Sequence, residues 1–148
     1  MRLASLMTAA ALALTAPAAW AQSATTTATG VKQPDGATGG SAGSAAAGNT
    51  SASTVGVGAT SEGASAIGVG GSAAAPDGRA TTNSNISGND KNAQVKAQAM
   101  DHGTFSKSHT HTKIKKGDVT SRTKAMAHVP GSKPVMSTST TPASPTNP

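Results

Sequence analysis

Bulky apolar positions are concentrated at the start of the chain and are sparse after it. All four leucines and the only tryptophan lie within residues 1–21. Arg2 is followed by an uncharged stretch, residues 3–16, that is rich in Ala and Leu, and small residues flank Trp20 in Ala19-Trp20-Ala21. This pattern is typical of a cleavable signal peptide of the bacterial type. We predict a signal helix over residues 1–21, cleavage between Ala21 and Gln22, and a mature protein that is periplasmic or secreted.

The leader is too short to serve as a membrane anchor. Its apolar stretch of about 14 residues falls short of the roughly 20 that a helix needs to span a bilayer. The chain also contains no cysteine, which removes the lipid-modified cysteine of bacterial lipoproteins together with disulfides and thiolate chemistry. We therefore expect no transmembrane anchor in the mature chain.

After the leader, the polar and apolar pattern predicts only two short elements. A helix near residues 90–101 would begin at Asp90 and end before Gly103, with one stripe formed by Ala93, Ala97 and Met100. A hairpin near residues 105–129 would turn at Lys116-Gly117-Asp118. Both would be marginal, because a lone short helix and an isolated two-stranded hairpin are each close to the limit of stability in water.

Composition then argues against a packed core. The 127 residues from 22 to 148 contain eight Val, three Ile, one Phe and no Leu, which is about 9%. Chains in which these four types fall below about 20% are usually disordered. The reason is that ordering a residue costs roughly 1–2 kcal/mol of backbone entropy, which so few large side chains cannot offset. We predict a mostly intrinsically disordered, low-complexity chain after the signal helix.

Charge divides the mature chain into three segments. Residues 22–90 are rich in Ala, Gly, Ser and Thr and carry a net charge of −2, as a flexible linker would. Residues 91–133 hold nine of the eleven basic residues of the mature chain, all four histidines and two aspartates, for a net charge of +7. Residues 134–148 form a Ser/Thr/Pro-rich tail that we expect to be disordered.

One short sequence recurs within the small-residue segment. Val55-Gly56-Val57-Gly58-Ala59 is echoed by Ile67-Gly68-Val69-Gly70-Gly71, twelve positions later. With Ser65-Ala66 before it, the second copy resembles the short head repeats of trimeric autotransporter adhesins, which stack many times. At least three repeats are normally needed to bury a shared face, so two copies do not predict such a fold.

The basic segment indicates an anionic partner. Its excess of positive charge attracts polyanions with an affinity that falls as salt rises. Outside the cytoplasm these would be anionic polysaccharide, lipid headgroups or other polyanions of the cell envelope. Specific nucleic-acid binding is not expected, because Phe105 is the only aromatic residue left for base stacking. We expect a non-enzymatic structural or interaction protein of unknown biochemical role.

The alternative is a periplasmic protein that binds copper or another metal. Ala99-Met100-Asp101-His102 and Ala125-Met126-Ala127-His128 repeat one pattern, and His109-Thr110-His111 lies between them. In an extended strand, residues two apart point to the same side, and imidazole with thioether suits copper. The candidate ligands are Met100, His102, His109, His111, Met126 and His128. Lysines around the central pair oppose a cation, and only the electrostatic alternative should weaken as salt rises.

Catalytic motifs give no support for an enzyme. Gly39-Gly40-Ser41-Ala42-Gly43 matches the Gly-Xaa-Ser-Xaa-Gly pattern of hydrolases, but it lies in a Gly, Ser and Ala run where a chance match is expected. The six acidic residues are scattered, and no glycine-rich stretch leads into a phosphate-binding Gly-Lys-Ser or Gly-Lys-Thr. We expect no catalytic site and no cofactor.

Overall fold

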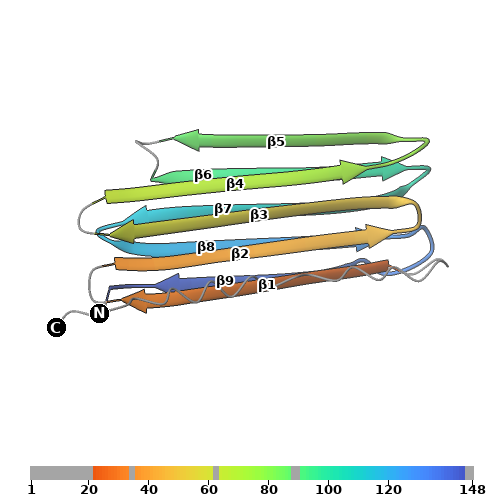
Figure 1. The fold of residues 1–148 in the computed structure, drawn as a ribbon. Helices are drawn as coiled ribbons and strands as arrows, with labels where there is room; N and C mark the ends of the chain where they lie inside the picture. The colour runs from red at the N-terminus through yellow and green to blue at the C-terminus, as the bar shows by residue number, and fades with distance from the viewer. Residues whose placement is uncertain (1–21, 34–35, 62–63, 88–90, 146–148) are drawn as a thin grey trace, which may run out of the picture.

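The protein is a two-layered β sandwich of antiparallel strands (Figure 1). The computed structural model describes residues 22–33, 36–61, 64–87 and 91–145. Sheet A contains β1 (Gln22–Gln33), β2 (Gly36–Ala47), β3 (Thr50–Ser61) and β4 (Ala64–Ala74), in that order. Sheet B contains β5 (Arg79–Ser87), β6 (Asn92–Asp101), β7 (Thr104–Lys115), β8 (Asp118–His128) and β9 (Val135–Ala143), also in chain order.

Each sheet is a run of successive hairpins, and the chain changes layer once, between β4 and β5. In the stacked layers β1 lies over β9, β2 over β8, β3 over β7 and β4 over β6, while β5 lies at the edge (Figure 1). All nine residues of β5 are exposed. The described part of the chain holds no helix long and apolar enough to cross a membrane.

The core between the sheets is made of small side chains. Among the described residues, the buried positions comprise ten alanines, ten serines or threonines, five glycines and only three branched apolar residues, Val95, Ile114 and Val119. Alanine buries little area, but it also loses no side-chain entropy when it is ordered. A core of this kind gains its buried area from many small side chains on closely packed strands, and not from a few large ones.

Hydroxyl groups in this core bond to one another across the two sheets. Ser41 Oγ lies 2.7 Å from both Ser121 Oγ and Thr123 Oγ1, and Thr54 Oγ1 lies 2.8 Å from Thr110 Oγ1. Because a hydroxyl both donates and accepts, such a chain of hydroxyls can satisfy itself without water. The buried polar groups therefore avoid the desolvation cost that makes unpaired ones destabilising.

Glycines on the inner face allow the sheets to approach closely. A Cβ atom added at Gly43 would lie 2.3 Å from Thr123 Cγ2, and one added at Gly56 would lie 2.3 Å from Thr112 Oγ1. Neither distance leaves room for a side chain. The high glycine content of β2 and β3, which reads as linker in the sequence, is thus part of the packing.

This fold shows that the predicted disordered, low-complexity chain is wrong. Val, Ile, Leu and Phe are scarce, but the buried positions are filled mainly by Ala, Ser and Thr, and hydroxyls among them are paired. The described residues between 22 and 87 form β1 to β5, apart from residues 48–49 and 75–78, and β9 lies within the predicted tail. The predicted signal peptide, residues 1–21, lies outside the described residues, and Gln22 is the first residue of β1.

The predicted helix near residues 90–101 is also wrong, because Asn92–Asp101 is strand β6. Ala93, Val95, Ala97 and Ala99 are all buried, which is the period of two of a strand and not the wider period of a helix. Asp90, the expected helix cap, lies outside the described residues.

The hairpin near residues 105–129 is present as β7 and β8, with Lys115 paired to Asp118. Lys116 and Gly117 have φ angles of 53° and 86°, as a two-residue type I′ turn requires. The hairpin is not the isolated, marginal element that the sequence indicated. It lies in the interior of a five-stranded sheet, where both strands have a further partner.

The two copies of the sequence echo lie next to each other. They fall on β3 and β4, which run antiparallel, so Val57 pairs with Gly68 and Gly56 pairs with Val69. Each valine is thus opposite a glycine. The repeated sequence thus places a valine on one strand opposite a glycine, which has no side chain, on the other.

Candidate functional site

Strand β7 separates two kinds of side chain by simple alternation. Its inward positions are hydroxyl residues and one isoleucine, namely Ser106, Ser108, Thr110, Thr112 and Ile114. Its outward positions between them are basic, namely Lys107, His109, His111, Lys113 and Lys115. Because successive side chains of a strand point to opposite faces, the hydroxyl core and the positive charge are both consequences of the same pattern.

The neighbouring strands extend this positive charge across sheet B. Lys96 of β6 and Lys124 of β8 pair with His109 from either side. Gln94 and Arg122 flank His111 in the same way. Adjacent strands are about 4.8 Å apart and outward side chains recur about every 6.7 Å along a strand, so the groups form a regular grid. We call the outward residues Lys96, Lys107, His109, His111, Lys113, Lys115, Arg122 and Lys124 the basic face.

Among the described residues, little negative charge opposes this face. Asp118 lies at its end, paired with Lys115. Asp101 ends β6 and its side chain contacts His102 in the next turn, and Asp77 lies in the loop between the two sheets. The six Lys and Arg side chains of the basic face are therefore held near one another with a single acid at their margin.

His109 lies at the centre of the basic face, and the charges around it change its pKa. Burial lowers the pKa of His109 from its ordinary value of 6.5, and Lys96, His111 and Lys124 lower this pKa further. Its Nε2 atom is buried and has no hydrogen-bond partner within the described residues. The ring is therefore kept neutral near pH 7, and an anion placed over it would oppose the effect of the two lysines.

The outer face of sheet A contrasts with the basic face. Outward positions of β1 to β4 are Ser, Thr, Ala, Gly and Val, including the exposed Val31, Val55 and Val57. Lys32 is the one charged residue described in these four strands, and it lies near the end of β1. The described charge of the sandwich is thus concentrated on one of its two faces.

The predicted metal ligands are distributed over this same face. His109 and His111 point to one side, as their spacing predicts, and Met126 lies one row from His109 on β8. Met100 and His128 are in a row at one end, separated by Phe105, and His102 lies in the β6–β7 turn with a φ angle of 43°. Within the described residues no three His, Asp or Glu side chains lie close enough to hold a metal ion. The metal-binding hypothesis stays a prediction.

The end row carries the aromatic side chain of the face. The Phe105 and His128 rings lie 5.1 Å apart at an angle of 39°. Lys107 Nζ lies 4.8 Å from the centroid of the Phe105 ring, within the range of a cation–π contact. Phe105 is thus already covered by two neighbours at the margin of the basic face.

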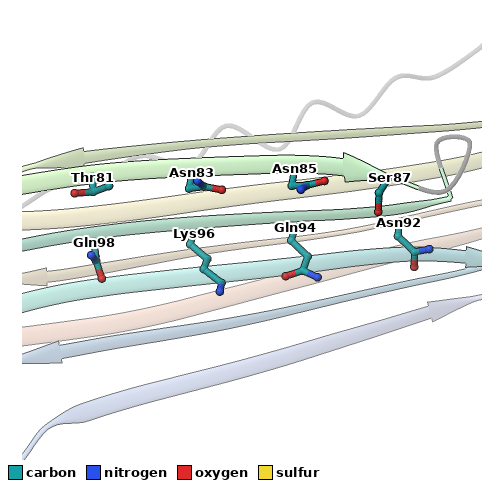
Figure 2. Close-up of a pocket in the computed structure, with 8 residues that line it drawn as sticks. All are labelled: Thr81, Asn83, Asn85, Ser87, Asn92, Gln94, Lys96 and Gln98. Carbon is teal, nitrogen blue, oxygen red and sulfur yellow. The ribbon is translucent and has the colours of Figure 1, made fainter.

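A polar groove of about 460 Å³ adjoins the basic face along β5 and β6 (Figure 2). The lining side chains form four cross-strand rows, Thr81 with Gln98, Asn83 with Lys96, Asn85 with Gln94, and Ser87 with Asn92. Sequence reasoning missed this groove, because it placed β5 in a linker and Gln94 and Gln98 in a helix. The alternation in Lys96-Ala97-Gln98-Ala99 was the signal that could have found its β6 side.

Comparison with protein-family models, curated proteins and solved structures finds no match to this chain. Its function is therefore inferred from the basic face and the adjoining groove alone.

Proposed function

We propose that this protein is a non-enzymatic binding protein that attaches to anionic material of the cell envelope through the basic face of sheet B. The observation that carries the proposal is the register of β6, β7 and β8, which aligns six Lys and Arg side chains on one surface with Asp118 as the only acid described there. An extended polyanion can contact several of them at once.

Holding these cations on strands makes the attraction more effective than the same charges on a flexible chain would be. The spacing of the side chains is fixed by the sheet, so a polyanion does not pay to order the backbone beneath it. Inside the sandwich the hydroxyl bonds of Ser108 and Thr110 to Thr54 hold β7 against sheet A. The outward lysines of β7 therefore keep their positions relative to one another.

The charge also predicts the conditions of binding. Contacts between exposed charges weaken when the Debye length shortens from about 10 Å at 0.1 M salt to about 3 Å at 1 M. The affinity should therefore fall steeply as salt rises, whereas coordination of a metal by histidine and methionine would hardly change. The salt dependence separates the electrostatic proposal from the metal-binding alternative.

The test compares two variants that lose the same charge at different places. The first, Lys107→Gln/Lys113→Gln/Lys124→Gln, removes three cations from the basic face. The second, Lys32→Gln/Lys91→Gln/Lys133→Gln, removes three cations that lie outside it. Binding of residues 22–148 to fluorescent polyphosphate and to polygalacturonate would be measured by fluorescence polarisation at several salt concentrations.

The face variant should bind both polymers about 150-fold more weakly at low salt, because about 1 kcal/mol for each of three cations near an anionic surface gives about 3 kcal/mol. The matched variant should lose less than about three-fold. Equal losses in the two variants would show that net charge alone is responsible, and no binding by the unchanged protein would refute the proposal.

A further inference from the structure

The groove beside the basic face has a different chemistry from that face. Five of its eight lining side chains are amides, two are hydroxyls and one is a lysine, Lys96. Within the described part of the chain, no side-chain hydrogen bond joins any of the eight to another protein group. The groove therefore presents unused donors and acceptors to whatever lies in it.

We propose that this groove makes acidic polysaccharides the preferred polyanions of the protein. The proposal rests on the proposed function, because the groove would bind the hydroxyl groups of the sugar while the basic face binds its acidic groups. Each amide offers two donors and one acceptor, and each hydroxyl offers both. A ligand that satisfies them must itself carry donors as well as acceptors.

This requirement distinguishes among the polyanions. Phosphate groups of polyphosphate or of lipid headgroups offer only acceptors, so the amide oxygens of the groove would face them without a donor. A polysaccharide carries hydroxyl groups on every unit and can donate to those oxygens. DNA also carries donors, but they lie on bases that need a stacking surface, and the groove is lined by no aromatic side chain.

The shape of the groove fits a chain rather than a single small molecule. The four rows extend from Thr81 to Ser87, which at about 3.3 Å per residue is about 20 Å along the strand. In Figure 2 the two lines of side chains run side by side along β5 and β6. β5 is exposed along its whole length, so a polymer can enter and leave at either end.

Lys96 connects the groove to the basic face. It is opposite Asn83 on one side and His109 on the other, and Lys124 follows in the same row. An acidic group bound to Lys96 therefore places the neighbouring hydroxyls of the sugar beside Asn83, and further acidic groups can reach Lys124. One row of side chains offers both kinds of contact.

The test uses two pairs of substitutions on opposite sides of β5. Asn83→Ala/Asn85→Ala changes the groove, and Thr82→Ala/Ser84→Ala changes residues that are also exposed but point to the other face of the same strand. Circular dichroism would establish that both variants keep the fold. The probes are polygalacturonate, polyphosphate, single-stranded DNA and vesicles of dihexadecyl phosphate, whose headgroup carries no hydroxyl donor, all at one salt concentration and one charge concentration.

The unchanged protein should bind polygalacturonate more tightly than the other three probes. The groove variant should lose about 5- to 100-fold in affinity for polygalacturonate and less than two-fold for polyphosphate, and the matched variant should lose neither. Tighter binding of polyphosphate, DNA or vesicles, or an unchanged affinity of the groove variant for polygalacturonate, would overturn the proposal. Either result would leave the role of the basic face standing, because that role is tested separately, by comparing the Lys107→Gln/Lys113→Gln/Lys124→Gln variant with its matched control and with the unchanged protein.

Discussion

A single methyl group at Gly56 tests the closeness of the two sheets. Gly56 is on the inner side of β3, and a Cβ atom there would lie 2.3 Å from Thr112 Oγ1 and 2.7 Å from Thr110 Cγ2. Both threonines belong to β7 in the opposite sheet and are fully buried. Thr112 Oγ1 also lies 2.8 Å from Ser121 Oγ, so any shift that accommodates the methyl group disturbs a core hydrogen bond. Gly56→Ala must therefore either separate the sheets or break this contact.

The expected magnitude follows from two opposing effects. Overpacking a well-packed core costs about 1–3 kcal/mol. Replacing a strand glycine by alanine returns about 0.5–1 kcal/mol, because alanine has less conformational freedom to lose. Gly56→Ala should therefore destabilise the protein by about 1–2 kcal/mol. For a chain of this size each kcal/mol lowers Tm by about 4 °C, so the drop should be about 4–8 °C.

Gly68→Ala is the matched control. Gly68 lies on the outer face of β4, one strand away from Gly56, and an added Cβ atom would meet nothing within 4 Å. This variant should be as stable as the unchanged protein or up to about 1 kcal/mol more stable. Thermal unfolding followed by circular dichroism near 218 nm, together with urea unfolding, would measure both. Equal Tm values for the two variants would refute the close approach of β3 and β7, and the lack of a cooperative transition in the unchanged protein would refute the packed sandwich itself.

Three further outcomes follow from the structure. Ser41→Ala removes a hydroxyl that contacts two others at 2.7 Å and should cost about 1–2 kcal/mol in urea unfolding, whereas Ser53→Ala on the exposed face should cost less than about 0.5 kcal/mol. Lys116→Asn should raise the urea midpoint by the equivalent of about 0.5–1 kcal/mol, because asparagine before Gly117 favours the positive φ angles of a type I′ turn. Because the pKa of His109 is lowered in the folded protein, the unfolded chain binds more protons below pH 6.5, and the free energy of unfolding should fall as the pH drops through that value. His109→Gln should make the free energy of unfolding depend less on pH in this range. An unchanged dependence would contradict the lowered pKa of His109.

The sequence predicts the β7–β8 hairpin, and it carries enough information to predict β6 as well, where the helical prediction is wrong. In β7, hydroxyl and basic residues alternate without interruption from Ser106 to Lys113. In β6, Ala93, Val95, Ala97 and Ala99 are separated by polar residues. Both patterns have the period of two of a strand with one buried face. They do not by themselves predict a packed sheet, because Ser, Thr and Ala are typical of solvated linkers as well as of a core of small side chains.

Sheet A could not be predicted in the same way, because its two faces are made of the same residue types. Ser41 is buried and bonded to sheet B, whereas Ser44, three positions later, is on the outer side of β2. Nothing in the local sequence distinguishes them. What separates them is the position of Ser121 and Thr123 on the opposite sheet, which is a contact between residues about 80 positions apart.

The sequence predicts that the positive charge lies in one segment of the chain, but not that these side chains share one face of a sheet. Counting charges placed an excess of positive charge in residues 91–133, and the structure locates six of these Lys and Arg side chains on one side of three paired strands. The groove needed β5, whose partner strand and exposed position follow only from the change of layer after β4. Charge is an additive property of the sequence, whereas a groove between two strands is a property of their pairing.

Because the described charge is concentrated on the outer face of sheet B, the sandwich would bind an anionic surface in one orientation. When Lys107, Lys113 and Lys124 rest on an anionic surface, sheet A turns its Ser, Thr, Ala and Gly residues toward the surrounding water. A layer of such molecules would replace a charged exterior by a neutral, hydrated one. Cationic dyes and cationic peptides, which bind the uncovered surface through its negative charge, would then bind less. The protein would thus shield the surface to which it binds.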